Sequence, residues 1–197
     1  ERNPKSLEAM LGMAELARLA NRPDESLEWL NKAVKTEPTA ISPRQRLVAY
    51  YLAAHETNKA LVVANESVAK NTNDVNALYL LAQVHLAQRN FDSAVATFTR
   101  ITALQPRMPA AYVQLANAQM GAGKHTAARE TLQRALALSP ASLDIKAALI
   151  SVEVAEGKLD AALKRAQELQ ALYPNEAAGY ILAGDLLMNK SRYAEAA

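Results

Sequence analysis

The feature that most constrains the fold of this chain is a pattern that recurs every 34 residues. Two series of residues follow this spacing: a series of prolines, with Thr72 at the one mark that lacks a proline, and a series of small residues. The prolines are Pro4, Pro38, Pro106, Pro140 and Pro174, and the small residues are Ser26, Ala60, Ala94, Ala128, Ala162 and Ala196. A period of this length is typical of repeat proteins, in which each unit packs only against its neighbours. We therefore expect a chain built from one repeated structural unit.

One period, from Val75 to Met108, indicates what the repeated unit is. Leu78, Leu81 and Ala82 lie three and four residues apart, so they share one face of a helix. After a short polar turn, the same spacing continues in a second helix, and Pro106 is expected to end that helix because proline has no N–H to donate. Each unit is therefore predicted to be a pair of amphipathic helices.

These helix pairs predict an all-α fold, a right-handed solenoid (superhelix) of eleven full helices and the stub of a twelfth, without strands. The second helix of each unit has a candidate N-cap, a side chain that accepts hydrogen bonds from the free N–H groups of the first turn. In the second repeat, residues 41–74, Ser42 is expected to cap the first helix, with Pro43 at the first position of that helix. The candidate caps of the second helices are Asp24, Asn58, Asp92, Thr126 and Asp160.

We expect a single array over residues 1–197. Natural arrays end in a capping unit with a polar outer face, and neither end of this sequence resembles one, which favours a fragment of a longer array. Leu186, Leu187 and Tyr193 are therefore expected to expose apolar surface and to cause weak end-to-end self-association. The predicted repeats are 7–40, 41–74, 75–108, 109–142 and 143–176, followed by a partial repeat, 177–197.

The composition argues against several classes of protein. The formal net charge is +2 and no basic stripe is visible, so nucleic acid is not an expected partner. Cysteine is absent, which removes disulfides and thiolate chemistry but does not decide the compartment. The sequence has no apolar run of the roughly 18 residues that a spanning helix needs. We therefore expect no membrane insertion by this segment.

No stretch of the sequence predicts an enzyme, a metal site or a cofactor. Gly121–Thr126 suggests a phosphate-binding loop, but that motif needs glycine where Ala118 stands and a hydroxyl residue where His125 stands. The three histidines fall at different offsets of the period, so they are not expected to bind one metal ion. Packing against the next repeat is favoured for Trp29. We expect no catalytic residue, no metal and no cofactor.

The repeated motifs can be compared with the patterns of known repeat families. They include Leu78-x2-Leu81-Ala82, Tyr112-x2-Leu115-Ala116, Tyr180-x2-Ala183-Gly184 and Ala94-x3-Phe98, besides the closing prolines. Over essentially the whole chain they resemble the tetratricopeptide repeat (TPR) family, whose pattern is W-x2-L-G-x2-Y, A-x3-F and a closing proline. The resemblance implies a solenoid of antiparallel helix pairs. It also implies a buried packing role for His85, which stands at an offset where the family often carries a tyrosine between helices.

Two repeats depart from the family pattern at the same two positions. Arg44 and Lys146 stand where the family has a large aromatic residue, and Val48 and Ile150 stand where it has glycine or alanine. Bulk at the glycine or alanine position is expected to push neighbouring helices apart in the second and fifth repeats.

The resemblance also implies where a partner binds. In TPR proteins the first helices of successive repeats line a concave groove, and their second, fifth, ninth and twelfth positions face it. No basic residue stands at a fifth or ninth position, and Arg18 alone at a twelfth cannot replace a bidentate clamp, so a neutral groove is predicted. Packing between repeats stays open as the alternative for Leu86 and Met120. The groove residues carried over by offset are Arg18, Gln45, Asn76, Tyr79, Gln83, Leu86, Val113, Asn117 and Met120.

These features favour a non-catalytic scaffold that binds a protein or peptide segment in its groove, with Tyr79 as the best anchor. The alternative is a structural spacer in a secretion or envelope assembly, with an empty groove. Near the C-terminal end, Gly179–Met188 and Arg192–Ala197 resemble more narrowly the TPR lipoproteins of bacterial PEP-CTERM/exosortase systems, which accompany exopolysaccharide production and protein sorting. That resemblance implies a periplasmic or outer-membrane-anchored protein, while a cytoplasmic location stays open.

Overall fold

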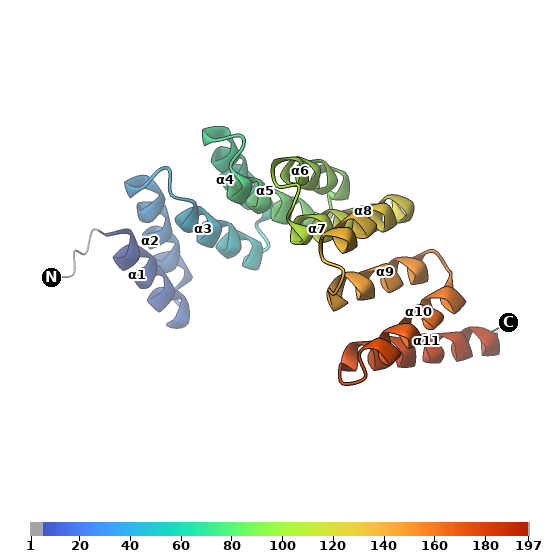
Figure 1. The fold of residues 1–197 in the computed structure, drawn as a ribbon. Helices are drawn as coiled ribbons and strands as arrows, with labels where there is room; N and C mark the ends of the chain where they lie inside the picture. Colours follow the sequence, from blue (N-terminus) through green and yellow to red (C-terminus); the bar gives the residue numbers. More distant parts are fainter. Residues whose placement is uncertain (1–5, 197) are drawn as a thin grey trace. The chain divides into compact units, whose positions relative to one another are not determined.

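The computed structural model of this chain describes residues 6–196, and it places the side chains of all of these except 178 and 189–196. Over the described range the chain forms eleven α-helices and no strand, so the predicted all-α fold is confirmed (Figure 1). The helices are α1 (Leu7–Leu19), α2 (Pro23–Thr36), α3 (Ile41–Ala53), α4 (Thr57–Lys70), α5 (Val75–Ala87), α6 (Phe91–Leu104), α7 (Pro109–Gly121), α8 (His125–Leu138), α9 (Leu143–Ala155), α10 (Leu159–Leu172) and α11 (Ala177–Ala196).

The helix boundaries follow the period of the sequence. The first helix of each pair, from α1 to α9, has 13 residues, and the second, from α2 to α10, has 14. Each second helix ends two residues before a mark of the proline series, as α6 does at Leu104, ahead of Pro106. The predicted helix pairs are therefore present at the predicted spacing.

The helices group into two compact units, one extending to Leu104 and the other beginning at Gln105. Within each unit, the two helices of a pair pack against each other and each pair packs against the next. In the first unit, Trp29 packs as predicted against a core cluster of Ala14, Leu30 and Leu47, which joins the first repeat to the second. A single continuous array stays a prediction.

Each helix pair buries one large and one small side chain at equivalent places, but the helix that supplies the large one differs between repeats. In the first, third and fourth repeats the first helix supplies an alanine and the second a leucine or phenylalanine. In the second and fifth repeats the first helix supplies valine or isoleucine and the second an alanine. The pairs, all buried, are Ala14 with Leu30, Ala82 with Phe98, Ala116 with Leu132, Val48 with Ala64, and Ile150 with Ala166.

The expected effect of bulk at Val48 and Ile150 is confirmed. The helices α3 and α4, and likewise α9 and α10, contact each other less extensively than the helices of the other pairs do. The bulk is nevertheless fully buried, because Val48 shares a core cluster with Ala64, and Ile150 shares one with Ala166. The departure from the family pattern is thus compensated inside the same repeat.

The predicted N-caps of the second helices are wrong by two residues. Since α2 begins at Pro23 and α10 at Leu159, Asp24 and Asp160 lie inside the first turn instead of ahead of it. A carboxylate in the first turn still interacts favourably with the positive end of the helix dipole. The same displacement applies to Asn58, Asp92 and Thr126.

The prediction for the start of the third helix is also wrong. The helix α3 begins at Ile41, one residue ahead of Ser42, and Pro43 is its third residue. Proline is tolerated there because the first N–H groups of a helix have no partner within it. Side-chain caps occur instead ahead of α1, α5, α6 and α9, where the side chains of Ser6, Asp74, Asn90 and Ser142 accept from backbone N–H groups of the first turn.

The turn inside each helix pair depends on one residue with a positive φ, at the same place in every period. Glycine adopts this left-handed conformation freely, whereas for other L-residues it costs roughly 1–2 kcal/mol. Three turns of the first unit therefore carry a conformational cost that the two turns of the second unit avoid. The residues are Asn21 (φ 56°), His55 (φ 59°), Arg89 (φ 56°), Gly123 (φ 72°) and Gly157 (φ 76°).

The helix α11 runs without a break from Ala177 to Ala196, so the predicted stub of a twelfth helix is wrong. Lys190–Ser191, at the place in the period where the other repeats turn, lies inside this helix. Leu186 is buried, contrary to expectation, whereas Leu187 is exposed as expected. The side chain of Tyr193 lies outside the described residues.

Candidate partner-binding site

The largest group of predicted groove residues lies on α5. Asn76, Tyr79, Gln83 and Leu86 are three or four residues apart, so they follow one face of the helix. Asn76 and Gln83 are exposed, while Tyr79 and Leu86 are half-buried. This face therefore presents two amide groups to solvent beside a partly buried phenol ring.

Tyr79 is positioned by the core beneath it. Its ring stands edge-on to the ring of Phe98 from α6, with 5.8 Å between the ring centroids and 72° between the ring planes. Aromatic pairs favour this geometry. Burial raises the pKa of the Tyr79 hydroxyl, which therefore stays protonated at neutral pH. The ring is a neutral and well-held surface for a partner to contact.

The second unit supplies Val113, Asn117 and Met120 from α7. Asn117 is exposed, but Val113 and Met120 are half-buried and pack against the core cluster that joins α7 and α8 to α9. The Sδ atom of Met120 also lies 3.5 Å from Nδ1 of His125. For Met120, the alternative of packing between repeats is therefore the better description, and the same holds for Val113.

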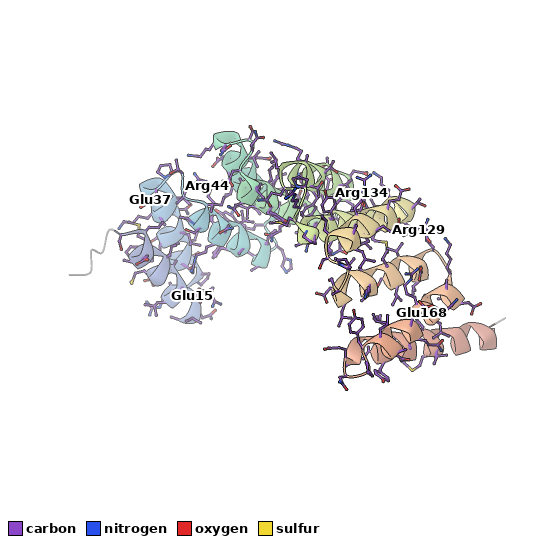
Figure 2. The ribbon with its side chains drawn as sticks, in the orientation of Figure 1. Glu15, Glu37, Arg44, Arg129, Arg134 and Glu168 are labelled. Atoms are coloured by element: carbon purple, nitrogen blue, oxygen red, sulfur yellow. The ribbon has the colours of Figure 1, made fainter. Side chains whose placement is uncertain are left out.

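Gln45 and Arg18, the remaining predicted residues, are exposed on α3 and α1. The Arg18 guanidinium donates to the carboxylate of Glu15, with Nη2–Oε1 at 2.5 Å and Nε–Oε2 at 2.9 Å. These hydrogen bonds lower the pKa of Glu15. Figure 2 labels Glu15 on the first helix of the chain. Arg18 is thus part of an ion pair on α1 and does not stand alone.

A hollow of about 460 Å³ opens between α1, α2 and α3 in the first unit. Its lining is mostly apolar, with three charged side chains, and includes Ala14, Ala49, Tyr50, Glu15, Arg18 and Arg46. Sequence reasoning missed Arg46 because the family offsets cover the second and ninth positions of a first helix but omit the sixth. Positions two, six and nine are four and three residues apart, so helix geometry alone could have placed Arg46 on the same face.

The second unit holds two largely buried carboxylates that have no part in the predicted groove. Glu153 is paired with Arg165, with Nη2–Oε1 at 2.8 Å. Glu156 accepts from Lys158 at 2.8 Å and from Arg129 of α8 at 2.7 Å. The hydrogen bond from Lys158 is the main reason why the pKa of Glu156 is lowered. These pairs connect neighbouring helices, and we interpret them as packing interactions.

His85 is half-buried on α5, and its Nδ1 atom has no hydrogen-bond partner among the described residues. Burial lowers the pKa of this imidazole, because a charged ring would lose hydration there. The neutral ring agrees with the predicted packing role. Across the described part of the chain, no three His, Cys, Asp or Glu side chains gather closely enough to hold a metal ion.

The length and character of the helices also bear on membrane insertion. Within residues 6–196, none of the helices combines the length and the apolar character that crossing a bilayer requires.

Comparisons of the sequence with known proteins support a repeat architecture. Two family profiles described as tetratricopeptide repeat match the chain, one over residues 1–41 and 79–142 and the other over residues 119–186. A search of curated proteins finds no match.

Solved structures with the same fold are similar over most of the chain. A thermophilic TPR protein of Thermus thermophilus, TTC0263, is 19% identical with a TM-score of 0.66, over 93% of this chain and 100% of its own. A TPR protein of Parabacteroides merdae has a TM-score of 0.77 at 14% identity, over 96% and 75%. PilW, a type IV pilus biogenesis factor, has a TM-score of 0.73 at 21% identity, over 91% and 84%. Since one family profile alone matches more than half of the sequence, this chain belongs to the tetratricopeptide repeat family.

Proposed function

We propose that the chain is a non-catalytic scaffold that binds an extended or helical segment of a partner protein along the first helices of its repeats. The observation that carries the proposal is the face of α5, where the exposed amides of Asn76 and Gln83 flank the half-buried ring of Tyr79. An amide side chain both donates and accepts, which matches the backbone of a bound segment. An aromatic ring supplies contact area at low entropic cost.

In the second unit, the residue proposed to contact the partner is Asn117, because its amide is exposed on α7. Val113 and Met120 support that surface from beneath and contribute less direct contact. The predicted groove set therefore divides into residues that present polar groups and residues that hold the helices in place.

A photo-crosslinker tests which helices carry the partner. The crosslinking residue p-benzoylphenylalanine replaces Gln83, exposed on α5, or Val62, exposed on α4, as the matched control. In cells that produce the protein naturally, a partner should attach at position 83 and not at position 62. Attachment at position 62 alone would overturn the proposal, because it would place the partner on the second helices.

Tyr79→Ala should weaken binding of that partner by roughly 1–3 kcal/mol, with little change in salt dependence, because the ring acts by apolar contact. Tyr79→Phe is the matched control, since it keeps the ring and its contact with Phe98. Titration calorimetry at low and high salt measures both quantities. A steep loss of wild-type affinity at high salt would mean that the contact is ionic, contrary to this proposal.

For the cellular setting, we propose an envelope assembly concerned with exopolysaccharide production or protein sorting, with a periplasmic or outer-membrane-anchored location. Two observations support this setting. Gly179–Met188 and Arg192–Ala197 resemble the TPR lipoproteins of PEP-CTERM systems, and the fold is shared with PilW, whose name connects it to pilus biogenesis. Fractionation of the producing cells tests the location, and recovery of the protein only in the cytosol would refute it.

A second candidate function, a structural spacer that binds through its edges, is favoured by the apolar surface of α11. Tyr180, Ile181, Leu187 and Met188 are exposed there by 52%, 60%, 51% and 61%. Exposed apolar patches favour association, so this surface also supports the proposed weak self-association. Light scattering at rising protein concentration tests it, and Leu187→Lys should lower the apparent mass if α11 forms the contact.

A further inference from the structure

The hollow between α1, α2 and α3 has apolar walls and a charged mouth. Ala14 and Leu30 are buried at its inner side, while Ala49 and Ala53 belong to the exposed part of α3. Its volume of about 460 Å³ lies in the range of small-ligand pockets, roughly 300–1,000 Å³. It can therefore admit a whole apolar side chain, including an aromatic ring.

The three charged groups at the mouth are unequally paired. Glu15 is held in a fork by Arg18, with contacts of 2.5 and 2.9 Å. Arg46 reaches the same carboxylate only at 3.9 Å, which is too long for a hydrogen bond. Two guanidinium groups against one carboxylate leave one net positive charge, and the donors of Arg46 remain available to another acceptor.

The edge of the hollow near Tyr50 has a different character. Burial raises the pKa of the Tyr50 hydroxyl, and the nearby carboxylates of Asp24 and Glu56 act in the same direction. Glu56 is paired with Lys59 at 2.7 Å, and neither carboxylate lines the hollow. The charge that a ligand meets on entering is therefore that of the arginine side.

We propose that this hollow binds an apolar side chain of the partner segment whose neighbouring carboxylate pairs with Arg46 and Arg18. Charge complementarity selects this occupant, because a basic neighbour would be repelled by the weakly paired Arg46 guanidinium and a neutral one would add no charged acceptor for its donors. The inference rests on the proposed scaffold function and deepens it by naming the chemistry of the partner. It also revises the expectation of a neutral groove for the first two repeats.

A fragment titration tests the hollow without any partner. The probe is 3-phenylpropionate, which joins a ring to a carboxylate, and the comparison compounds are 3-phenylpropylamine and propionate. Binding to the full chain is followed by amide NMR. We expect 3-phenylpropionate to shift the signals of Ala49 and its neighbours on α3. The amine and propionate should bind at least about fivefold more weakly, as expected for the loss of one partly exposed ion pair or of the apolar contact.

Three variants make the test specific. Arg46→Ala should weaken 3-phenylpropionate about fivefold and leave the neutral analogue 3-phenylpropanol unchanged. Ala49→Trp should fill the hollow and abolish binding of both compounds, with Ala53→Trp as its replacement if the first variant fails to fold. Arg107→Ala, an exposed arginine of the second unit, is the matched control and should change nothing.

Two results would overturn the inference. The first is binding of 3-phenylpropylamine as strong as that of 3-phenylpropionate, and the second is unchanged binding in the tryptophan variants. Either result would leave the scaffold proposal standing if crosslinking at position 83 still captures the partner. Loss of that crosslink with intact fragment binding would instead reject the scaffold function and keep the hollow as a small-molecule site.

Discussion

The third and fifth repeats solve the same packing problem in opposite ways. In the third, Ala82 of α5 leaves room for Phe98 of α6, whereas in the fifth Ile150 of α9 fills the space that Ala166 of α10 leaves. All four side chains are at most 1% exposed, so neither arrangement leaves the interior open. The comparison teaches that the repeat constrains the combined volume of the two positions more tightly than the residue at either one.

Where the large side chain comes from the first helix instead of the second, the fourth position of the first helix also changes in polarity. In the third repeat this position is Leu78, which is buried, but in the fifth it is Lys146. The Lys146 ammonium donates to the Tyr173 hydroxyl at 3.0 Å and lies 4.8 Å from the centroid of that ring. The second repeat has Arg44 at this position, buried and donating to the Ala40 carbonyl. Where the two helices of a pair contact each other less, polar contacts to backbone and tyrosine are present.

Among the variants that test this comparison, Phe98→Ala should lower the free energy of unfolding most. It removes the large member of the pair without replacing it, and such a cavity costs about 3–5 kcal/mol of unfolding free energy. Urea unfolding followed by far-UV circular dichroism measures the change. Thr99→Ala, on the exposed side of the same helix, is the control and should stay within about 0.5 kcal/mol. Equal losses in the two variants would contradict the assignment of Phe98 to the core.

Ile150→Ala, the matching truncation in the fifth repeat, should cost about 2–5 kcal/mol. Adding Ala166→Leu recreates the arrangement of the first repeat and should restore part of the loss, with a coupling of about 0.5–3 kcal/mol in the double-mutant cycle. The same unfolding measurement on the wild type, both single variants and the double variant gives the coupling. Strict additivity would show that the two positions do not share one volume.

Gly123→Ala tests the difference between the turns of the two units. No atom lies within 4 Å of the added Cβ, so the cost is conformational and should be roughly 1–2 kcal/mol. The reverse change in the third repeat, Arg89→Gly, should raise the unfolding temperature by relieving the same cost. If Arg89→Gly lowers it, the contact of the Arg89 guanidinium with the Phe91 ring, 6.0 Å from the centroid, outweighs the strain.

The smallest expected effect concerns pH. The pKa of His85 in the folded protein lies below its usual 6.5, so the unfolded chain binds the proton more readily. The associated stability is complete above pH 6.5 and is lost as the pH falls through the lowered pKa. Wild-type protein should therefore lose more stability than His85→Gln on mild acidification. Parallel curves of unfolding temperature against pH would contradict this.

The period and the chemistry of single residues determined different parts of the prediction. Apolar spacing and closing prolines such as Pro106 sufficed for the number and order of the helix pairs. The start of each second helix was misplaced because it lies two residues after the left-handed residue of the turn, at Asn21 as at Gly123, whatever side chain follows. Capping preference at Asp24 was therefore a weaker signal than turn geometry.

The candidate site was predicted less completely than the fold. Family offsets identified Tyr79 and the exposed amides, but they cannot separate a residue that faces a partner from one that faces the next repeat. Met120 shows this limit, because its contacts depend on how α9 packs. Arg46, in contrast, lines the hollow but was not predicted. Its distance from Glu15 depends on the packing of α1 against α3, which no spacing within one helix specifies.

The placement of both members of each large and small pair within one repeat has a consequence for how such a chain can change length. A duplicated or deleted stretch of 34 residues carries Ala82 together with Phe98, or Ile150 together with Ala166, so the interior of the copied unit remains filled. Only the surfaces that meet the neighbouring repeats must adapt. Unequal recombination between repeats can therefore lengthen or shorten the chain without a second mutation inside the duplicated unit.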